Sequence, residues 1–128
     1  MNAADAGQRA LVAALRGAGI AVYDGPPLGA AYPYAAISEG SATDWSTKDA
    51  RGRELRLSFA IWDDGGSAAR LHALAAAAED AVEAMPRDLP GYRVASLVLL
   101  RSRIVRDPDG PWAARLDYRV RMLATSHS

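Results

Sequence analysis

Ser46 and Lys48 are a pair of side chains whose types and spacing could carry out nucleophilic catalysis. A lysine close to a serine can act as the general base that activates the serine hydroxyl. Such a dyad needs a desolvated lysine of low pKa and an oxyanion hole, and the sequence signals neither. Because Asp49 follows Lys48 directly, a solvated loop is the better interpretation, and we expect no catalytic residue and no enzyme.

The sequence signals for an ion-binding or cofactor-binding site are equally weak. The segment 107–110 (Asp-Pro-Asp-Gly) resembles the start of a calcium loop, but the downstream acidic ligands are missing, so it predicts a hairpin turn. The segment 65–67 (Gly-Gly-Ser) could hold an anion before a helix, but two aspartates precede it directly. Without cysteine, and with only His72 and His127, the chain predicts no metal site and no cofactor.

The distribution of charge is more informative than any single motif. The 128 residues carry 15 basic and 15 acidic side chains, and this zero net charge argues against a dedicated nucleic-acid binder. Residues 1–86 hold seven basic and eleven acidic groups, whereas residues 87–128 hold eight and four. This basic segment could bind phosphate or an acidic protein surface, or it could be a solvated face. We favour pairing with protein over nucleic acid.

The scaffold that positions these side chains is predicted as an α+β domain spanning residues 1–128, with 125–128 as a flexible tail. Apolar residues at helical spacing predict a helix from Asp5 to Gly17 and a longer one from Ser67, the expected N-cap, to Met85. The element order α-β-β-β-α-β-β indicates a mainly antiparallel β-sheet with two α-helices packed on one face. No stretch approaches the roughly 18 apolar residues of a membrane-spanning helix.

The strands are predicted from runs and alternation of apolar residues. Short strands are expected at 20–23 and 34–39, followed by a polar loop from Ser41 to Gly52 and a clearly alternating strand at 55–62. Trp45 lies in this loop, where it either folds back on its own core, which we slightly favour, or anchors a partner. The last third predicts a long hairpin.

The arms of this hairpin are residues 92–106 and 112–124. The first arm is apolar on both faces from Val94 to Leu100, which predicts a central strand covered on both sides. The helices cover one face of the sheet, and the residues expected on the other face are Ala95, Leu97, Leu99 and Trp62. Exposing apolar area is unfavourable by about 25 cal/mol per Å². Either a neighbouring subunit covers this face, or sheet curvature and arginine stems shield it.

Five segments carry a recognisable family pattern: 32–37, 39–40, 44–48, the strand ending at Ile61-Trp62, and the helix from Gly66 to Val82. In these segments the chain resembles the tail terminator, or tail completion, proteins of long-tailed phages and of phage-derived gene transfer agents. The resemblance spans about residues 8 to 122. It implies a structural virion protein that forms a hexameric ring, caps the tail tube, stops its polymerisation and joins the tail to the head.

The partners that the resemblance implies are other copies of the chain, the tail tube protein and a neck or connector (stopper) protein. DNA would pass through the lumen without sequence-specific binding, and no membrane is involved. Assembly is expected in the bacterial host cytoplasm, and the assembled protein at the head–tail junction of a virion or phage-like particle.

We expect contacts with partners in the Ser41–Gly52 loop and in the hairpin. The candidate contact residues are Trp45, Ser46, Lys48, Trp62, Arg101, Arg103, Arg115, Arg119 and Arg121. Two alternatives stay open on this reasoning. One is another neck or minor tail component, such as a stopper or tube protein, and the other is a small cytoplasmic ligand-binding or enzymatic α+β domain.

Overall fold

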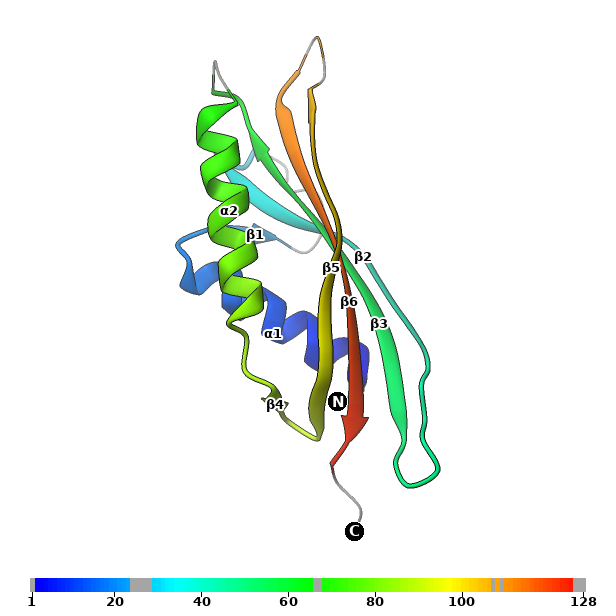
Figure 1. Ribbon diagram of the computed structural model, residues 1–128. Helices are drawn as coiled ribbons and strands as arrows, with labels where there is room; N and C mark the ends of the chain where they lie inside the picture. The colour runs from blue at the N-terminus through cyan, green and yellow to red at the C-terminus, as the bar shows by residue number, and fades with distance from the viewer. Residues whose placement is uncertain (1, 24–28, 66–67, 107, 109, 126–128) are drawn as a thin grey trace.

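The architecture is a single β-sheet with both helices on one side of it, seen in a computed structural model that describes residues 2–23, 29–65, 68–106, 108 and 110–125 (Figure 1). The elements in chain order are α1 (Ala3–Gly17), β1 (Val22–Tyr23), β2 (Tyr34–Asp44), β3 (Gly52–Asp63), α2 (Ala69–Glu83), β4 (Asp88–Leu89), β5 (Tyr92–Arg106) and β6 (Trp112–Ala124). In the described residues the sheet order is β1-β2-β3-β6-β5-β4, and β1–β2 is its one parallel pair. The predicted α+β class and element order are confirmed, with the two-residue β4 as an addition.

The helices bury one apolar stripe each against the sheet. Helix α1 begins where the Asn2 side chain accepts a hydrogen bond from the Asp5 backbone N–H at 2.8 Å, an N-cap that the sequence analysis did not identify. Gly7 lets α1 approach β3 closely, because a Cβ there would lie 2.5 Å from Leu55 Cδ1. Helix α2 buries Leu71, Ala75, Ala78 and Val82, which recur every three or four residues.

Some residues singled out from the sequence lie outside the described residues: the predicted cap at Ser67, part of the 107–110 turn, and His127. Where the structure describes the start of α2, Ala68 precedes it and makes no side-chain cap. Of the predicted flexible tail, Thr125 donates its backbone N–H to the Gly91 carbonyl at 3.0 Å, and 126–128 are not described.

The predicted polar loop from Ser41 to Gly52 is wrong in extent. Strand β2 continues to Asp44, and residues 41–44 pair with residues 53–56 of β3. The loop is therefore confined to residues 45–51. Backbone hydrogen bonds extend the ladder although residues 41–44 are exposed and three of them, Ser41, Thr43 and Asp44, are polar, so side-chain polarity was a poor guide to where this strand ends.

The prediction of a central strand for the first hairpin arm is also wrong. Strand β5 pairs with β6 along its length, but β4 covers only Tyr92 and Arg93 on its other side. From Ala95 onward the outer edge of β5 has no strand partner among the described residues, and Val98 and Leu100 are 38% and 42% exposed.

Two register irregularities in β5 reverse the expected facing of its side chains. They fall between Val94 and Ser96 and between Leu99 and Arg101. Each extra residue turns the following side chains to the opposite face. Leu97 and Leu99 thus pack against the helix-side core, and Ala95 is the extra residue of the first irregularity, so their predicted placement on the uncovered face is wrong.

Candidate interaction surface

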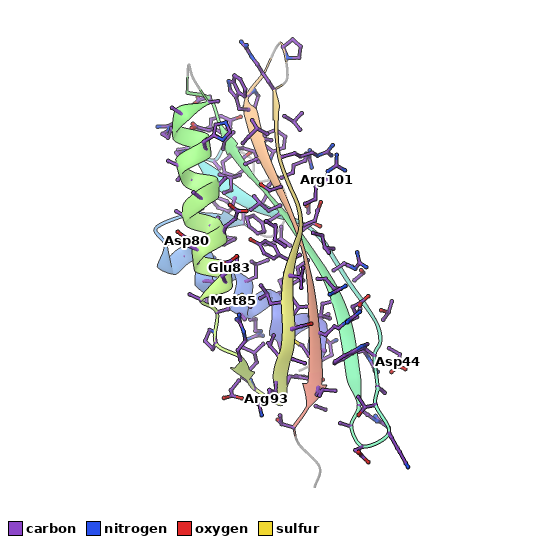
Figure 2. All side chains as sticks on the ribbon, viewed as in Figure 1. Asp44, Asp80, Glu83, Met85, Arg93 and Arg101 are labelled. Atoms are coloured by element: carbon purple, nitrogen blue, oxygen red, sulfur yellow. The ribbon has the colours of Figure 1, made fainter. Side chains whose placement is uncertain are left out.

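The side of the sheet that no helix covers, called the open face below, collects most of the predicted contact residues. Register places on it the alternate residues of β3, β6 and β5, including Arg56, Ser58, Trp62, Arg101, Arg103, Arg115, Asp117, Arg119 and Arg121. Arg101 extends away from the sheet on the side opposite to α2 (Figure 2). The alternation of strand residues therefore brings together six of the nine candidates, and Trp45 joins them through Arg121.

Trp45 contacts its own chain, but it lies on the open face and not in the hydrophobic core, so the favoured prediction that it folds back on the core is wrong. The Arg121 guanidinium carbon is 5.3 Å from the centre of the Trp45 ring, a cation–π contact. Arg121 Nε also donates to Glu54 Oε1 at 3.0 Å, and this hydrogen bond is the main cause that lowers the pKa of Glu54. Arg121 is thus engaged within its own subunit.

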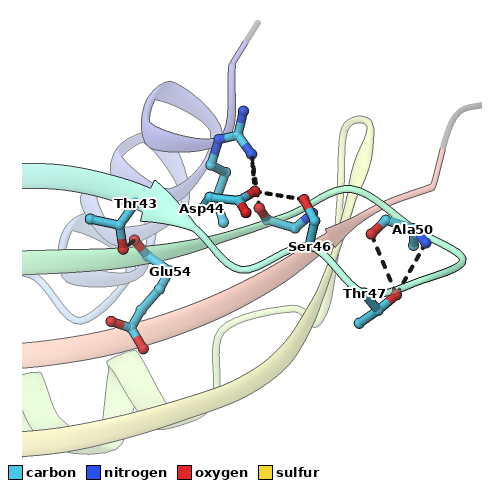
Figure 3. Close-up of polar contacts among 8 residues, drawn as sticks. Thr43, Asp44, Ser46, Thr47, Ala50 and Glu54 are labelled. Carbon is cyan, nitrogen blue, oxygen red and sulfur yellow. Dashed lines mark hydrogen bonds and ion pairs between the residues drawn. The ribbon is translucent and has the colours of Figure 1, made fainter.

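Ser46 shapes the loop and has no catalytic partner in the described residues. Its hydroxyl donates to Asp44 Oδ1 at 2.6 Å and accepts from the Gly52 backbone N–H at 3.1 Å. Asp44 Oδ1 also accepts from Arg53 at 3.1 Å (Figure 3). Lys48 is exposed in the same loop and makes no hydrogen bond or ion pair with a described residue, so the two side chains do not form a dyad.

Thr47 closes the other end of this loop. Its hydroxyl accepts from the backbone N–H of Ala50 at 3.1 Å and donates to the Ala50 carbonyl at 3.4 Å (Figure 3). Glycine is required where the loop meets β3, because a Cβ on Gly52 would overlap the carbonyl oxygen of Trp45. These contacts hold the loop, and with it Trp45, at one end of the open face.

Arginines dominate the middle of the open face. Arg56 pairs across the strands with Arg119, and Arg103 pairs with Arg115, so two like-charged pairs are direct neighbours. Arg119 Nε is buried and has no hydrogen-bond partner among the residues that the structure describes. Among the described residues, Arg101, Arg103, Arg115 and Arg119 form no ion pair.

A polar groove of about 450 Å³ runs beside these arginines. Its lining includes Arg56, Arg101, Leu100 and the pair formed by Ser58 and Asp117, whose Ser58 hydroxyl donates to Asp117 Oδ1 at 2.6 Å. Asp117 is the cross-strand neighbour of Arg101, but no ion pair joins the two side chains among the described residues. The groove offers hydrogen-bond donors and positive charge to an acidic partner.

The other end of the open face is aromatic, which the sequence analysis recognised only for Trp62. Tyr34 stacks on Tyr32 with ring centres 5.4 Å apart and meets Tyr23 edge-on at 5.9 Å. Tyr34 is also the cross-strand neighbour of Trp62, over which Arg115 lies at 5.7 Å. In the sequence, the close spacing of Tyr32 and Tyr34 was the feature that could have predicted this aromatic cluster. Exposed aromatic groups of this kind mark interaction sites.

Asp63 is the one buried charged residue among those described, and its role is structural. It accepts from Arg70 Nε at 2.7 Å and from the Gly65 backbone N–H at 3.2 Å. The hydrogen bond from Arg70 is the largest cause that lowers the pKa of Asp63. This pair ties the end of β3 to the first turn of α2. The described residues contain no group of three or more potential metal ligands.

Comparison with known proteins found a matching family model and a solved structure with a similar fold. The model of the tail completion protein gp17 family matches residues 3–123. A chain from a solved structure titled "Virion of native gene transfer agent (GTA) particle" is 23% identical, with a TM-score of 0.64 and coverage of 95% of each chain, which indicates a shared fold. No curated protein matches the sequence. In the described part of the chain, no helix has the length and apolar character needed to cross a membrane.

Proposed function

Because the chain belongs to the tail completion protein gp17 family and is a structural protein of a phage-type tail, we propose that it is the terminator of that tail. In this proposal six copies form a ring on the last ring of the tube, stop its growth and present a surface to the neck of the head. Membership of a structural virion family supports a non-enzymatic role.

The open face is the single observation that carries the proposal. It combines an exposed aromatic end, a polar groove and arginines without ion-pair partners among the described residues. A subunit that worked alone would gain nothing from such a surface, because apolar area in water is unfavourable. Contact with other copies, with the tube protein and with a neck protein would cover it.

A closed ring of identical subunits requires two unlike contact surfaces on each subunit. A cyclic ring of more than two copies uses heterologous contacts, in which one patch of a subunit meets a different patch of the next. The uneven charge of the chain supplies unlike patches. We place DNA in the lumen of the ring without sequence-specific contacts, and the protein first in the host cytoplasm and then at the head–tail junction.

Particles made without this protein test the proposal by electron microscopy. The expected result is tails of uncontrolled length or tails that are not joined to heads, with normal particles restored by the wild-type chain. Tails of normal length that remain unjoined would instead indicate a stopper, and missing tubes would indicate a tube component. Either result, or normal particles, would contradict the terminator role.

A further inference from the structure

Unpaired carboxylates on α2 lie on the side of the subunit opposite to the arginines of the open face. Asp80 and Glu83 lie on α2, on the helix side of the sheet, whereas Arg101 projects from the other side (Figure 2). Glu79 belongs to the same end of α2, and none of the three carboxylates forms an ion pair with a described residue. We call this set, Glu79, Asp80 and Glu83, the acidic end of α2.

The acidic end of α2 is unfavourable within one subunit. The C-terminal end of a helix carries partial negative charge from its free carbonyl groups, and acidic residues there are repelled. Helix α2 has no basic residue in its last turn. Arg87 follows the helix, but its guanidinium donates to the backbone carbonyls of Glu83 and Met85 and not to a carboxylate.

The groove lined by Arg56 and Arg101, together with the neighbouring Arg103, Arg115 and Arg119, is called the arginine groove below, and it has an excess of positive charge. Arg56 faces Arg119 and Arg103 faces Arg115 across the strands, and like charges in this position repel. Glu54 and Asp117 share this face; Glu54 pairs with Arg121 at 3.0 Å and with Arg56 at 3.7 Å, and Asp117 accepts from the Ser58 hydroxyl. Among the described residues, Arg101, Arg103, Arg115 and Arg119 on one surface and the three carboxylates of α2 on the other therefore form no ion pair within the subunit.

We propose that the acidic end of α2 of one copy docks into the arginine groove of the next copy. This inference rests on the proposed ring and names the surfaces that close it. Each subunit presents both halves on opposite sides, so the contact is heterologous and repeats from copy to copy. The groove of about 450 Å³ has room for carboxylate side chains, and Ala76, one turn before Asp80, is a small exposed residue of α2.

A second copy fits these observations better than DNA. Phosphodiesters would neutralise the arginines but leave the acidic end of α2 uncovered. The chain carries equal numbers of acidic and basic side chains, so pairing between copies satisfies both surfaces at once.

Site-specific cross-linking tests the contact directly, because the chain has no cysteine of its own. Particles are assembled from a mixture of two single variants, Glu83→Cys and Arg101→Cys, and then oxidised. We expect a cross-linked dimer that needs both variants. The matched control replaces Glu83→Cys by His72→Cys, an exposed position about 16 Å away along the same helix, and should give none.

A charge exchange supplies the second test. Glu83→Arg and Arg101→Glu should each lower the fraction of capped, joined tails about tenfold, and the double variant should recover most of that loss. Circular dichroism melts confirm that each variant folds. Absence of the mixed cross-link, or a double variant worse than either single one, overturns the proposed contact.

Two further outcomes separate this inference from its alternatives. If Arg101→Glu weakens binding to a duplex DNA fragment, the mixed cross-link does not form and the charge exchange fails to rescue, the groove serves DNA and the contact is wrong. If the mixed cysteine variants cap tails but form no mixed cross-link, the inference fails alone. If particles that lack the protein have normal tails, the terminator role itself fails.

Discussion

Arg56 on β3 and Arg119 on β6 are direct cross-strand neighbours on the open face. Opposed like charges destabilise a sheet pair by up to about 1 kcal/mol. Arg119 Nε is also buried without a hydrogen-bond partner, which adds to the unfavourable free energy. A surface that lowers the stability of the isolated subunit is typical of one selected for a partner.

Replacing Arg119 should therefore stabilise the isolated protein. Arg119→Gln removes the like-charge contact and the unpartnered Nε, and we expect Tm to rise by up to about 4 °C while tail capping falls. Arg51→Gln, at an exposed position in the β2–β3 loop, is the control and should leave Tm unchanged. A lower Tm for Arg119→Gln would contradict the explanation.

Gly52 should tolerate no side chain. A Cβ at this position would overlap the Trp45 carbonyl and lie 3.0 Å from the Met122 carbonyl oxygen, and both acceptors are backbone atoms. We expect Gly52→Ala to lower the free energy of unfolding by about 2 kcal/mol or more in urea titrations. Gly40→Ala in the same hairpin is the control, because its nearest contact would be an ordinary 3.6 Å. Equal effects of the two variants would refute this account of the loop.

The Asp63–Arg70 pair should make stability depend on pH. Because the hydrogen bond from Arg70 lowers the pKa of Asp63, the stabilisation is present above the unfolded-state pKa of about 4 and is lost as pH falls through the folded-state value. Asp63→Asn should lower the unfolding free energy by about 2 kcal/mol at pH 7, since the half-exposed Arg70 is screened by solvent.

Thermal melts between pH 7 and pH 2 check this prediction. The difference in Tm between Asp63→Asn and the wild type should become smaller as the pH falls. The neighbouring Asp64→Asn is the control, because Asp64 is 62% exposed and 3.9 Å from Arg70. A gap that stays constant with pH would show that the ionised carboxylate of Asp63 is not what stabilises the fold.

The Tyr118 hydroxyl should be dispensable. Tyr118 is 1% exposed and its OH has no hydrogen-bond partner. Burial, with the nearby carboxylates of Glu79 and Glu83, raises the pKa of Tyr118, so the phenol stays neutral. Tyr118→Phe should leave the unfolding free energy unchanged or raise it by up to about 1 kcal/mol.

Tyr118→Leu supplies the contrast to that variant. It removes the ring that stacks on Phe59 at 6.2 Å, and we expect it to lower the unfolding free energy by about 2 kcal/mol. A loss of the same size in Tyr118→Phe would reveal a hydrogen bond that the hydroxyl makes in solution.

The hairpin shows what this sequence predicts well. Both arms, 92–106 and 112–124, have the predicted bounds. Strict alternation in the second arm fixes its buried residues, and a cluster of turn residues separates the arms. The same alternation predicted that the arginines of β6 share one face of the sheet.

The facing of Leu97 and Leu99 shows where sequence reasoning fails. A register irregularity depends on the partner strand as well as on the residues around it, so no local pattern announces the shifts near Ala95 and Leu100. Asp63 was missed for a related reason, because its burial depends on Arg70 in the following helix. The tyrosine cluster at the end of the open face was also missed. Tyr23 reaches Tyr34 through the pairing of β1 with β2, and a strand of only two residues gives almost no sequence pattern.

The outer edge of β5, which has no strand partner among the described residues, could promote association of chains that are not assembled into a tail. A long free strand edge is a template for fibre-like stacking with identical chains. Here that edge carries Arg101, Arg103 and Arg106, so two copies approaching edge to edge bring six guanidinium groups together and repel each other. We therefore expect these arginines to act as gatekeepers against edge-to-edge association of free chains.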